Sequence, residues 1–292
     1  MYYFFFVFLS FRAFVINWHK LVPASQRSVF GCKAMILTRK NEASFYRFEN
    51  LARFPEIRHG IFTRRFGCST GPFESLNVGF GLGDEAPHVK ENRRIIARAI
   101  GSKDLIYAHQ VHGDQVLILN PEKFVSDGDS EPVLGTGDAL VTDSPGKFLA
   151  IQLADCQSIL LYDAVRRVIA NIHSGWRSSI KNIAGRTVHV MQKQFKCRSA
   201  DMFAGIGPSL GPCCAEFVHY RKEIPEIFWQ YKTAGDHFDF WTISRDQLAA
   251  AGVPRENIEV SNICTRCNTE VFFSYRGEGR TGRFASVIGL KK

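Results

Sequence analysis

Short apolar runs recur along the chain, and most of them are too short for a helix. Runs rich in valine, isoleucine, leucine and phenylalanine, bounded by glycine, proline or aspartate, are typical of buried strands. The predicted strands are residues 57–63, 106–109, 115–119, 139–142, 148–153, 158–162, 167–172, 202–206, 258–260 and 284–290.

Four longer segments carry the start and stop signals of helices. They are residues 89–100, ended by Gly101; 184–195; 216–231, interrupted by Pro225; and 244–251, with Ser244 as N-cap and Gly252 as C-cap. Because strands and helices do not alternate regularly, the expected fold class is α+β, with mixed β-sheets packed with helices. The chain shows no internal repeat or low-complexity linker, so residues 35–292 are expected to form a single compact domain.

The stretch LADCQSILLYDAVRRVIANIHSGWR, residues 153–177, is typical of a β-hairpin with a polar turn after Tyr162. If Tyr162 pairs with Arg167 across that turn, Cys156 and His173 lie opposite each other, with Cβ atoms about 4.5–5.5 Å apart. At that distance the two side chains can share a metal ion or a proton. The alternative is structural, with Cys156 as a small core residue and His173 bonded to the backbone.

A histidine beside a glycine in HQVHGDQV, residues 109–116, offers a third ligand. His112 precedes Gly113, and a glycine lets backbone and ligand approach each other closely. Two histidines and one cysteine leave the fourth position of a zinc ion open, which is the arrangement of catalytic zinc sites. The competing hypothesis makes Cys156 a nucleophile and His173 its base, for amide hydrolysis.

Two cysteine motifs are weaker candidates. Cys264 and Cys267 form a C-x-x-C motif, but zinc ribbons need a second such pair. The adjacent Cys213 and Cys214 have the wrong spacing for that role, so the motif is interpreted as structural or incidental. These two cysteines end the loop GIGPSLGPCC, residues 205–214, which is a candidate anion cradle.

Charged residues near the predicted strands are candidates for substrate contacts. Arg64 follows a predicted strand and precedes a loop that contains Asn77. Arginine in such a place suits phosphate or carboxylate recognition, although a solvated charge is the commoner case. Asp155, beside Cys156, is a candidate for orienting a ligand histidine.

The composition restricts the partners and the compartment. The chain has 292 residues, a formal net charge of +9 and eight cysteines. Outside residues 1–34, which hold four basic residues and no acid, lysines and arginines are scattered, without the clusters of a nucleic-acid surface. The charge therefore favours anionic small substrates and argues against nucleic acid as a partner. The cysteines are too sparse for a disulfide scaffold, which predicts a reducing, cytoplasmic location.

Residues 1–34 differ from the rest of the chain. Their apolar run is shorter than the about 20 residues of a membrane span, and no basic segment precedes it as in a secretory signal. Met35 opens a segment typical of a protein start. Residues 1–34 are therefore expected to be an extension outside the fold, without stable membrane association.

Eight motifs in a fixed order give the chain a family resemblance: FTRRFG, SLNVG, QVHGDQV, GDALVTD, LADCQSILLYD, HSGWR, GIGPSLGPCCAEF and FFSYRGEGRTGRFAS. With them, the sequence from about residue 60 onward resembles the laccase-domain family, also called YfiH-like or peptidoglycan editing factor-like proteins. The resemblance implies an α+β fold and a zinc site formed by His112, Cys156 and His173. It also implies phosphorolysis of adenosine, inosine and methylthioadenosine, with adenosine deamination as a further activity. Other labels in the family imply a copper polyphenol oxidase or an enzyme that edits peptidoglycan precursors.

A zinc-dependent purine nucleoside phosphorylase is therefore the preferred hypothesis, with the three metal ligands as its catalytic centre. Arg64, Asn77 and Arg177 are the expected substrate-binding residues for nucleoside and phosphate. Copper is the alternative metal, and a homodimer is left open. The cysteine hydrolase and the copper oxidase stay as alternatives, although nothing in the sequence resembles the multi-histidine clusters of multicopper oxidases.

Overall fold

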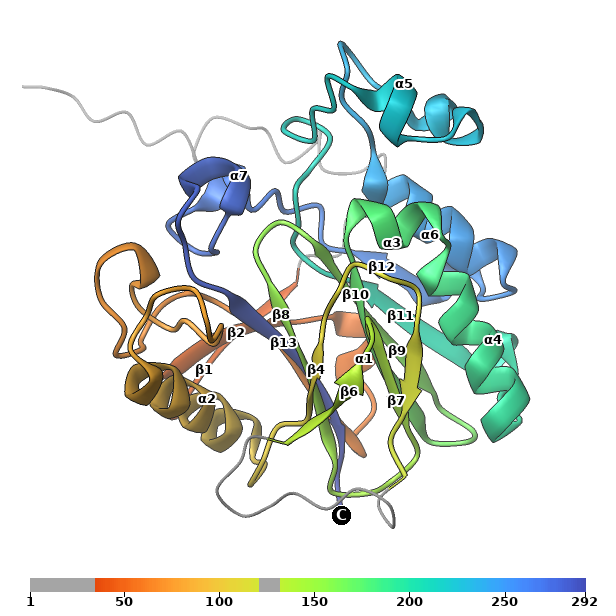
Figure 1. The fold of residues 1–292 in the computed structure, drawn as a ribbon. Coiled ribbons are helices and arrows are strands. Elements are labelled where there is room, and N and C mark those ends of the chain that lie inside the picture. Colours follow the sequence, from red (N-terminus) through yellow and green to blue (C-terminus); the bar gives the residue numbers. More distant parts are fainter. Residues whose placement is uncertain (1–34, 121–131) are drawn as a thin grey trace, which may run out of the picture. The chain divides into compact units, whose positions relative to one another are not determined.

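The computed structural model describes residues 35–120 and 132–292, and the expected extension of residues 1–34 lies outside the described residues. Figure 1 shows that strands dominate this part of the chain. In chain order the strands are β1 (Ile36–Lys40), β2 (Ala43–Arg47), β3 (Ile57–Phe62), β4 (Tyr107–His109), β5 (Val116–Ile118), β6 (Val133–Thr136), β7 (Ala139–Thr142), β8 (Phe148–Leu153), β9 (Gln157–Asp163), β10 (Val168–Ser174), β11 (Met202–Ile206), β12 (Ile258–Val260) and β13 (Phe284–Leu290). The α-helices are α1 (Glu49–Ala52), α2 (Ala86–Ile100), α3 (Trp176–Ile180), α4 (Ile183–Phe195), α5 (Tyr220–Glu223), α6 (Phe240–Ala250) and α7 (Tyr275–Glu278).

The described strands form two large sheets and one small one. The first large sheet has the order β1-β2-β3-β13-β8 and is antiparallel throughout. The second has the order β12-β11-β9-β10-β7-β5, and its two outermost pairs are parallel. Strands β4 and β6 make a small parallel sheet. The expected α+β fold with mixed sheets and helices in a single compact domain is confirmed.

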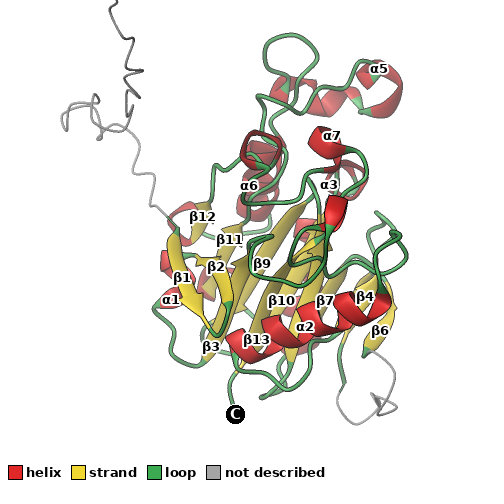
Figure 2. Ribbon diagram, turned by 90° about the vertical axis from the view of Figure 1, so that its left-hand side faces the viewer, coloured by secondary structure: helices red, strands yellow, loops and turns green. Residues whose placement is uncertain are grey.

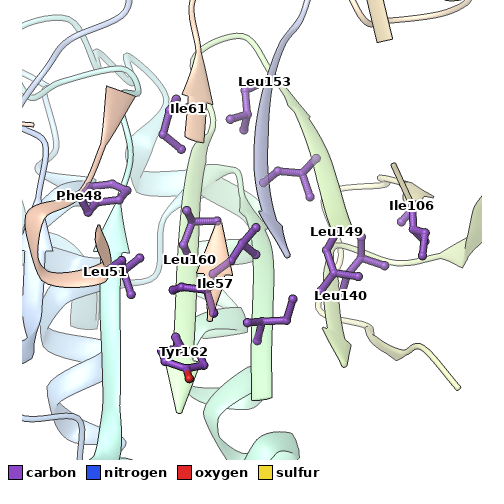
Figure 3. Close-up of a cluster of buried hydrophobic side chains, with 14 of the residues drawn as sticks. Phe48, Leu51, Ile57, Ile61, Ile106, Leu140, Leu149, Leu153, Leu160 and Tyr162 are labelled. Atoms are coloured by element: carbon purple, nitrogen blue, oxygen red, sulfur yellow. The ribbon is translucent and has the colours of Figure 1, made fainter. Parts of the chain in front are cut away.

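The main core lies between the two large sheets. Figure 3 shows Ile57 and Leu149 of the first sheet with Leu160 and Tyr162 of the second in one buried cluster. Helix α2 covers the other face of the first sheet, and α4 and α6 cover the other face of the second. Because both faces of the second sheet are covered, every residue of β9 and β10 is buried, which explains their nearly continuous apolar sequence.

Helix α2 confirms the predicted segment 89–100 and ends at Gly101, which has a φ of 77°. Helix α4 confirms the segment 184–195. The predicted N-cap of the last helix is wrong, because α6 begins earlier and Asp239 accepts the N–H of Thr242, whereas Ser244 is buried within the helix.

The helix predicted at residues 216–231 is mostly wrong. Only α5 and a 3₁₀ segment, Glu226–Tyr231, form there, on either side of Pro225. Proline removes a donor and disfavours helical backbone in the residue before it. The predictions also omitted strands β1, β2 and β6.

Helices α5 and α7 lie beyond one end of the strands, away from the C-terminus, as Figures 1 and 2 both show. The loops that lead to them follow β11 and β12. The candidate site described next lies at the adjoining ends of β9 and β10, and the loops after β4, β8 and β11 also contribute to it. Among the helices of the described residues, none combines the length and the apolar composition that crossing a membrane requires.

Candidate functional site

The β9–β10 hairpin carries Cys156 and His173, but the predicted register is wrong by two residues. Ile169, not Arg167, pairs with Tyr162, and His173 pairs with Ser158. The cause lies in the turn, where the Asp163 carboxylate accepts the N–H groups of residues 165 and 166 at 2.9 and 2.7 Å. Residue 167 then adopts a φ of 55° and belongs to the turn rather than the strand. A shift of two residues preserves the face on which a side chain lies, so the predicted convergence is retained.

Three side chains meet at the open end of this hairpin. His112 comes from the loop after β4 and has a φ of 56°. Its Nε2 lies 3.6 Å from the Sγ of Cys156, and its ring centre lies 4.8 Å from that of His173. The ligand atoms of all three residues lie within 4.8 Å of one another, so one metal ion could contact them together.

Asp138, at the start of β7, holds two of these ligands in place. Its Oδ1 lies 2.8 Å from the Nδ1 of His173, and it also accepts the N–H of His112 at 2.9 Å. Its Oδ2 accepts the N–H groups of Val111 and Gly113 at 3.2 and 2.7 Å. Burial opposes ionisation, but the hydrogen bonds from His173 and the loop outweigh it and lower the pKa of Asp138. A carboxylate bonded to Nδ1 leaves the Nε2 of His173 free to act as a ligand.

Gly175 provides the space for this arrangement. A Cβ atom at that position would lie 2.6 Å from the Cδ2 of His112 and 3.2 Å from the Sγ of Cys156. Its φ of −72° is ordinary, so the glycine is needed for close approach rather than for an unusual backbone conformation.

Electrostatic coupling favours a thiolate at the centre of the group. Burial opposes ionisation of Cys156, but His173 and the hydrogen bond to His112 lower the pKa of its thiol to about 6. Burial likewise disfavours the imidazolium of His173, but Cys156 and Asp138 raise its pKa to about 9. The thiolate is the form of cysteine that binds a metal or attacks a carbon atom.

The three residues line a pocket of about 690 Å³. This volume falls within the about 300–1,000 Å³ typical of small-molecule sites. The pocket combines large aromatic side chains with three arginines. The aromatic residues are Phe80, Trp176, Phe217 and Phe240, and the arginines are Arg177, Arg276 and Arg283. It can therefore accept a flat ring system together with an anionic group.

The expected substrate-binding residues are distributed unevenly. Arg177 lines the pocket, with its guanidinium 4.2 Å from the ring centre of Trp176. Arg64 contacts Glu278 at 2.6 Å and the carbonyl of Thr269 at 2.7 Å, and it is not among the described residues that line the pocket.

Asn77 and Asp155 both have structural contacts. The fully buried Asn77 donates to Asp84 at 2.7 Å. The carboxylate of Asp155 accepts from Thr265, Ser274 and the N–H of Arg276. Asp155 therefore anchors a loop instead of orienting a histidine, and the role proposed for it belongs to Asp138.

Sequence reasoning missed Asp138, Arg276 and Arg283. Two signals were available, because Asp138 follows a glycine directly ahead of a buried strand, and both arginines lie in the motif FFSYRGEGRTGRFAS. Neither signal identifies a partner, since Asp138 is 35 residues from His173. Their roles follow from the tertiary structure.

Comparisons with known proteins identify the family of this chain and several of its relatives. The family described as "Multi-copper polyphenol oxidoreductase laccase" matches residues 58–291. A purine nucleoside phosphorylase of Bacteroides thetaiotaomicron is 33% identical over 258 residues, which cover 84% of this chain and 96% of that protein. The purine nucleoside phosphorylase YfiH of Escherichia coli is 33% identical over 239 residues, covering 78% of this chain and 91% of that protein. The crystal structure of YlmD from Geobacillus stearothermophilus has a TM-score of 0.77 at 30% identity, covering 88% of this chain and 100% of that one.

Proposed function

The chain belongs to the family described as multi-copper polyphenol oxidoreductase laccase, and we propose that within it this protein is a zinc-dependent purine nucleoside phosphorylase. The observation that supports this most directly is that His112, Cys156 and His173 open into a pocket that contains both aromatic rings and arginines. The names of the relatives supply the reaction. The proposed substrates are phosphate with adenosine, inosine or methylthioadenosine.

The donor set fits a zinc ion. Two imidazoles and one thiolate are borderline-soft ligands, and three protein ligands with an open position are typical of catalytic zinc. Copper sites of the His₂Cys type use the same three donors and add a weak axial methionine, glutamine or backbone oxygen, so copper stays the alternative metal. A zinc ion held there would supply a Lewis acid beside the substrate.

The protein's own side chains account for binding and orientation. The apolar wall around Trp176 and Phe217 suits a purine, and Arg177, Arg276 and Arg283 suit phosphate. Phosphorolysis forms a bond from a phosphate oxygen to C1′ of the ribose and breaks the bond from C1′ to the purine nitrogen, and the purine takes up a proton. Placing phosphate and nucleoside in one pocket makes that displacement effectively unimolecular.

The proposal also includes a second activity, a location and an oligomeric state. Adenosine deamination, in which water replaces the amino group at C6, suits the same centre as a side activity. A cytoplasmic location and a homodimer also stay predictions.

A second function is favoured by one observation. Cys156, His173 and Asp138 resemble a catalytic triad, because the thiol and the carboxylate both interact with the ring of His173. In that case the Cys156 thiolate attacks an amide carbon, the C–N bond breaks while His173 gives its proton to the leaving amine, and water then hydrolyses the thioester. This reading corresponds to the amide hydrolase that edits peptidoglycan precursors.

The test measures zinc content and phosphate-dependent release of hypoxanthine from inosine for the same protein samples. In the zinc hypothesis, His112→Ala, Cys156→Ala and His173→Ala each lose zinc at this centre together with activity, because a three-ligand site has no spare ligand. His109→Ala is the matched control for zinc content and should keep the ion, since His109 lines the same pocket outside the three-residue group. A wild-type protein that stays fully active after zinc removal would refute the zinc hypothesis, and alkylation-sensitive amide hydrolysis would establish the alternative.

A further inference from the structure

A second cluster of metal-binding side chains lies outside the centre described above. The sulfur atoms of Cys213, Cys214, Cys264 and Cys267 all lie within 4.8 Å of one another. The sequence interpretation of the C-x-x-C motif as structural or incidental overlooked this pairing. The structure supplies the missing second pair from a segment about fifty residues earlier in the chain.

Backbone pairing brings the two segments together. Ser209, in the loop after β11, forms a parallel bridge with Cys264 and accepts the N–H of Thr265 at 3.0 Å. The N–H of Gly211 points at the sulfur of Cys264, at 3.3 Å. These contacts fix the cysteines by secondary structure, so their convergence does not depend on flexible side chains alone.

The distances between the sulfur atoms suit a tetrahedral ion. The sulfur of Cys267 lies 3.7 Å from that of Cys213 and 3.5 Å from that of Cys214. Zinc–sulfur bonds of about 2.3 Å place the sulfurs of a tetrahedral site about 3.8 Å apart, whereas a disulfide needs about 2.05 Å. All four residues are free thiols, and the adjacent Cys213 and Cys214 are poorly placed for a bridge with each other.

We propose that Cys213, Cys214, Cys264 and Cys267 form a second metal site, which takes a soft divalent cation such as zinc and has a structural role. Four thiolates fill every position of a tetrahedral ion and leave none for a substrate, which is the mark of a structural site. This differs from the centre at His112, where three ligands leave one position open. The inference does not rest on the proposed phosphorolysis.

The second site would join the two loops that form one wall of the pocket. Ala215 and Phe217 follow the first cysteine pair directly, and Tyr275 and Arg276 follow the second. Arg276 already bridges the loops, since its guanidinium donates to the carbonyl of Glu216 at 2.9 Å. A metal at the cysteines would fix both segments a short distance from that contact. The function of the second metal site is therefore to hold these two segments of the pocket wall in place.

Counting zinc per chain tests the proposal. The purified full chain, saturated with zinc and then dialysed, is expected to retain two zinc ions, and His173→Ala is expected to retain one. The double variant Cys213→Ser/Cys267→Ser is also expected to retain one, because it keeps the centre at His112. Cys68→Ser is the matched control, since Cys68 lies outside both groups and should leave the count at two. A double variant with the wild-type count would overturn the proposal.

A measurement on the unaltered chain keeps the test decisive if the double variant does not fold. Cys213 and Cys267 are exposed, so N-ethylmaleimide can reach both when they are free thiols. With zinc bound, both are expected to resist labelling in intact-protein mass spectrometry and to react once a chelator removes the metal. Rapid labelling at an unchanged zinc count would contradict the proposal. Protection released by a reductant, but not by a chelator, would indicate a disulfide and would equally overturn it.

Discussion

Replacing Asp138 by asparagine should weaken metal binding while keeping the shape of the site. Asparagine has nearly the same volume, but it has one acceptor oxygen where Asp138 uses two. If the amide oxygen stays with His173 and the N–H of His112, the amide NH₂ faces the N–H of Gly113, which is bonded at 2.7 Å in the wild type. The substitution also removes the negative charge that makes His173 a stronger ligand.

The structure sets the size of both effects. Asp138 is 1% exposed, so water cannot replace the lost acceptor at low cost. The N–H groups of Val111 and Gly113 both lose their acceptor, and each N–H left unsatisfied costs about 1–3 kcal/mol of unfolding free energy. Losing the carboxylate partner of a ligand histidine typically lowers metal affinity about 10–100-fold, which corresponds to about 1.4–2.7 kcal/mol.

The assay measures bound zinc at buffered free zinc concentrations and, separately, urea-induced unfolding. The zinc bound at the His173 centre is obtained by subtracting the zinc that His173→Ala retains. Asp155→Asn is the control, because its carboxylate accepts three hydrogen bonds, from Thr265, Ser274 and the N–H of Arg276, and none from a ligand histidine. It should also lose stability, to a smaller degree because Asp155 is only partly buried, and keep its zinc affinity at the His173 centre. Equal zinc affinity in Asp138→Asn and wild type would refute the role given to Asp138.

Three further predictions concern the site and the fold. Gly175→Ala should lower both zinc affinity and activity, because the new Cβ would lie 2.6 Å from His112 and displace it. The expected loss of activity is on the order of 100-fold. Unchanged kinetics would contradict this prediction. Leu160→Ala, fully buried between the sheets, should lower the free energy of unfolding by about 2–5 kcal/mol. The matched Val165→Ala, in the exposed hairpin turn, should change it by less than about 0.5 kcal/mol in the same urea titration. A chain shortened to begin at Met35 should keep its melting temperature and activity, and a large fall in either would show that residues 1–34 belong to the folded unit.

The sequence was informative wherever neighbours in the chain decide the structure. The largely apolar runs of β9 and β10 predicted a hairpin, and Gly101 correctly ended a helix. The hairpin also placed Cys156 and His173 on one face, because side chains alternate along a strand with a period of two. These features need only local backbone preferences and spacing.

The hydrophobic pattern was not enough to predict the structure where a single side chain selects one of several similar backbone conformations. The hairpin register depended on whether Asp163 would bind the N–H groups of the turn, and it does. The start of α6 depended on whether Asp239 or Ser244 would cap it, and both are good N-cap residues. Competing hydrogen bonds of similar strength decide such cases, and periodicity does not rank them.

Only the tertiary structure could join residues from distant segments. The family resemblance named His112 as a ligand, but its contact with Cys156 spans 44 positions, and Asp138 reaches His173 across 35. Cys213 and Cys267 meet across 54 positions, although each cysteine pair looked unremarkable in its own segment. Such contacts form because strands far apart in the sequence lie side by side in the second sheet, β7 beside β10 and β11 beside β12, so that segments at their ends meet. The sequence therefore determined which residues can bind a metal, and the order of the strands in the sheet decided which of them share one.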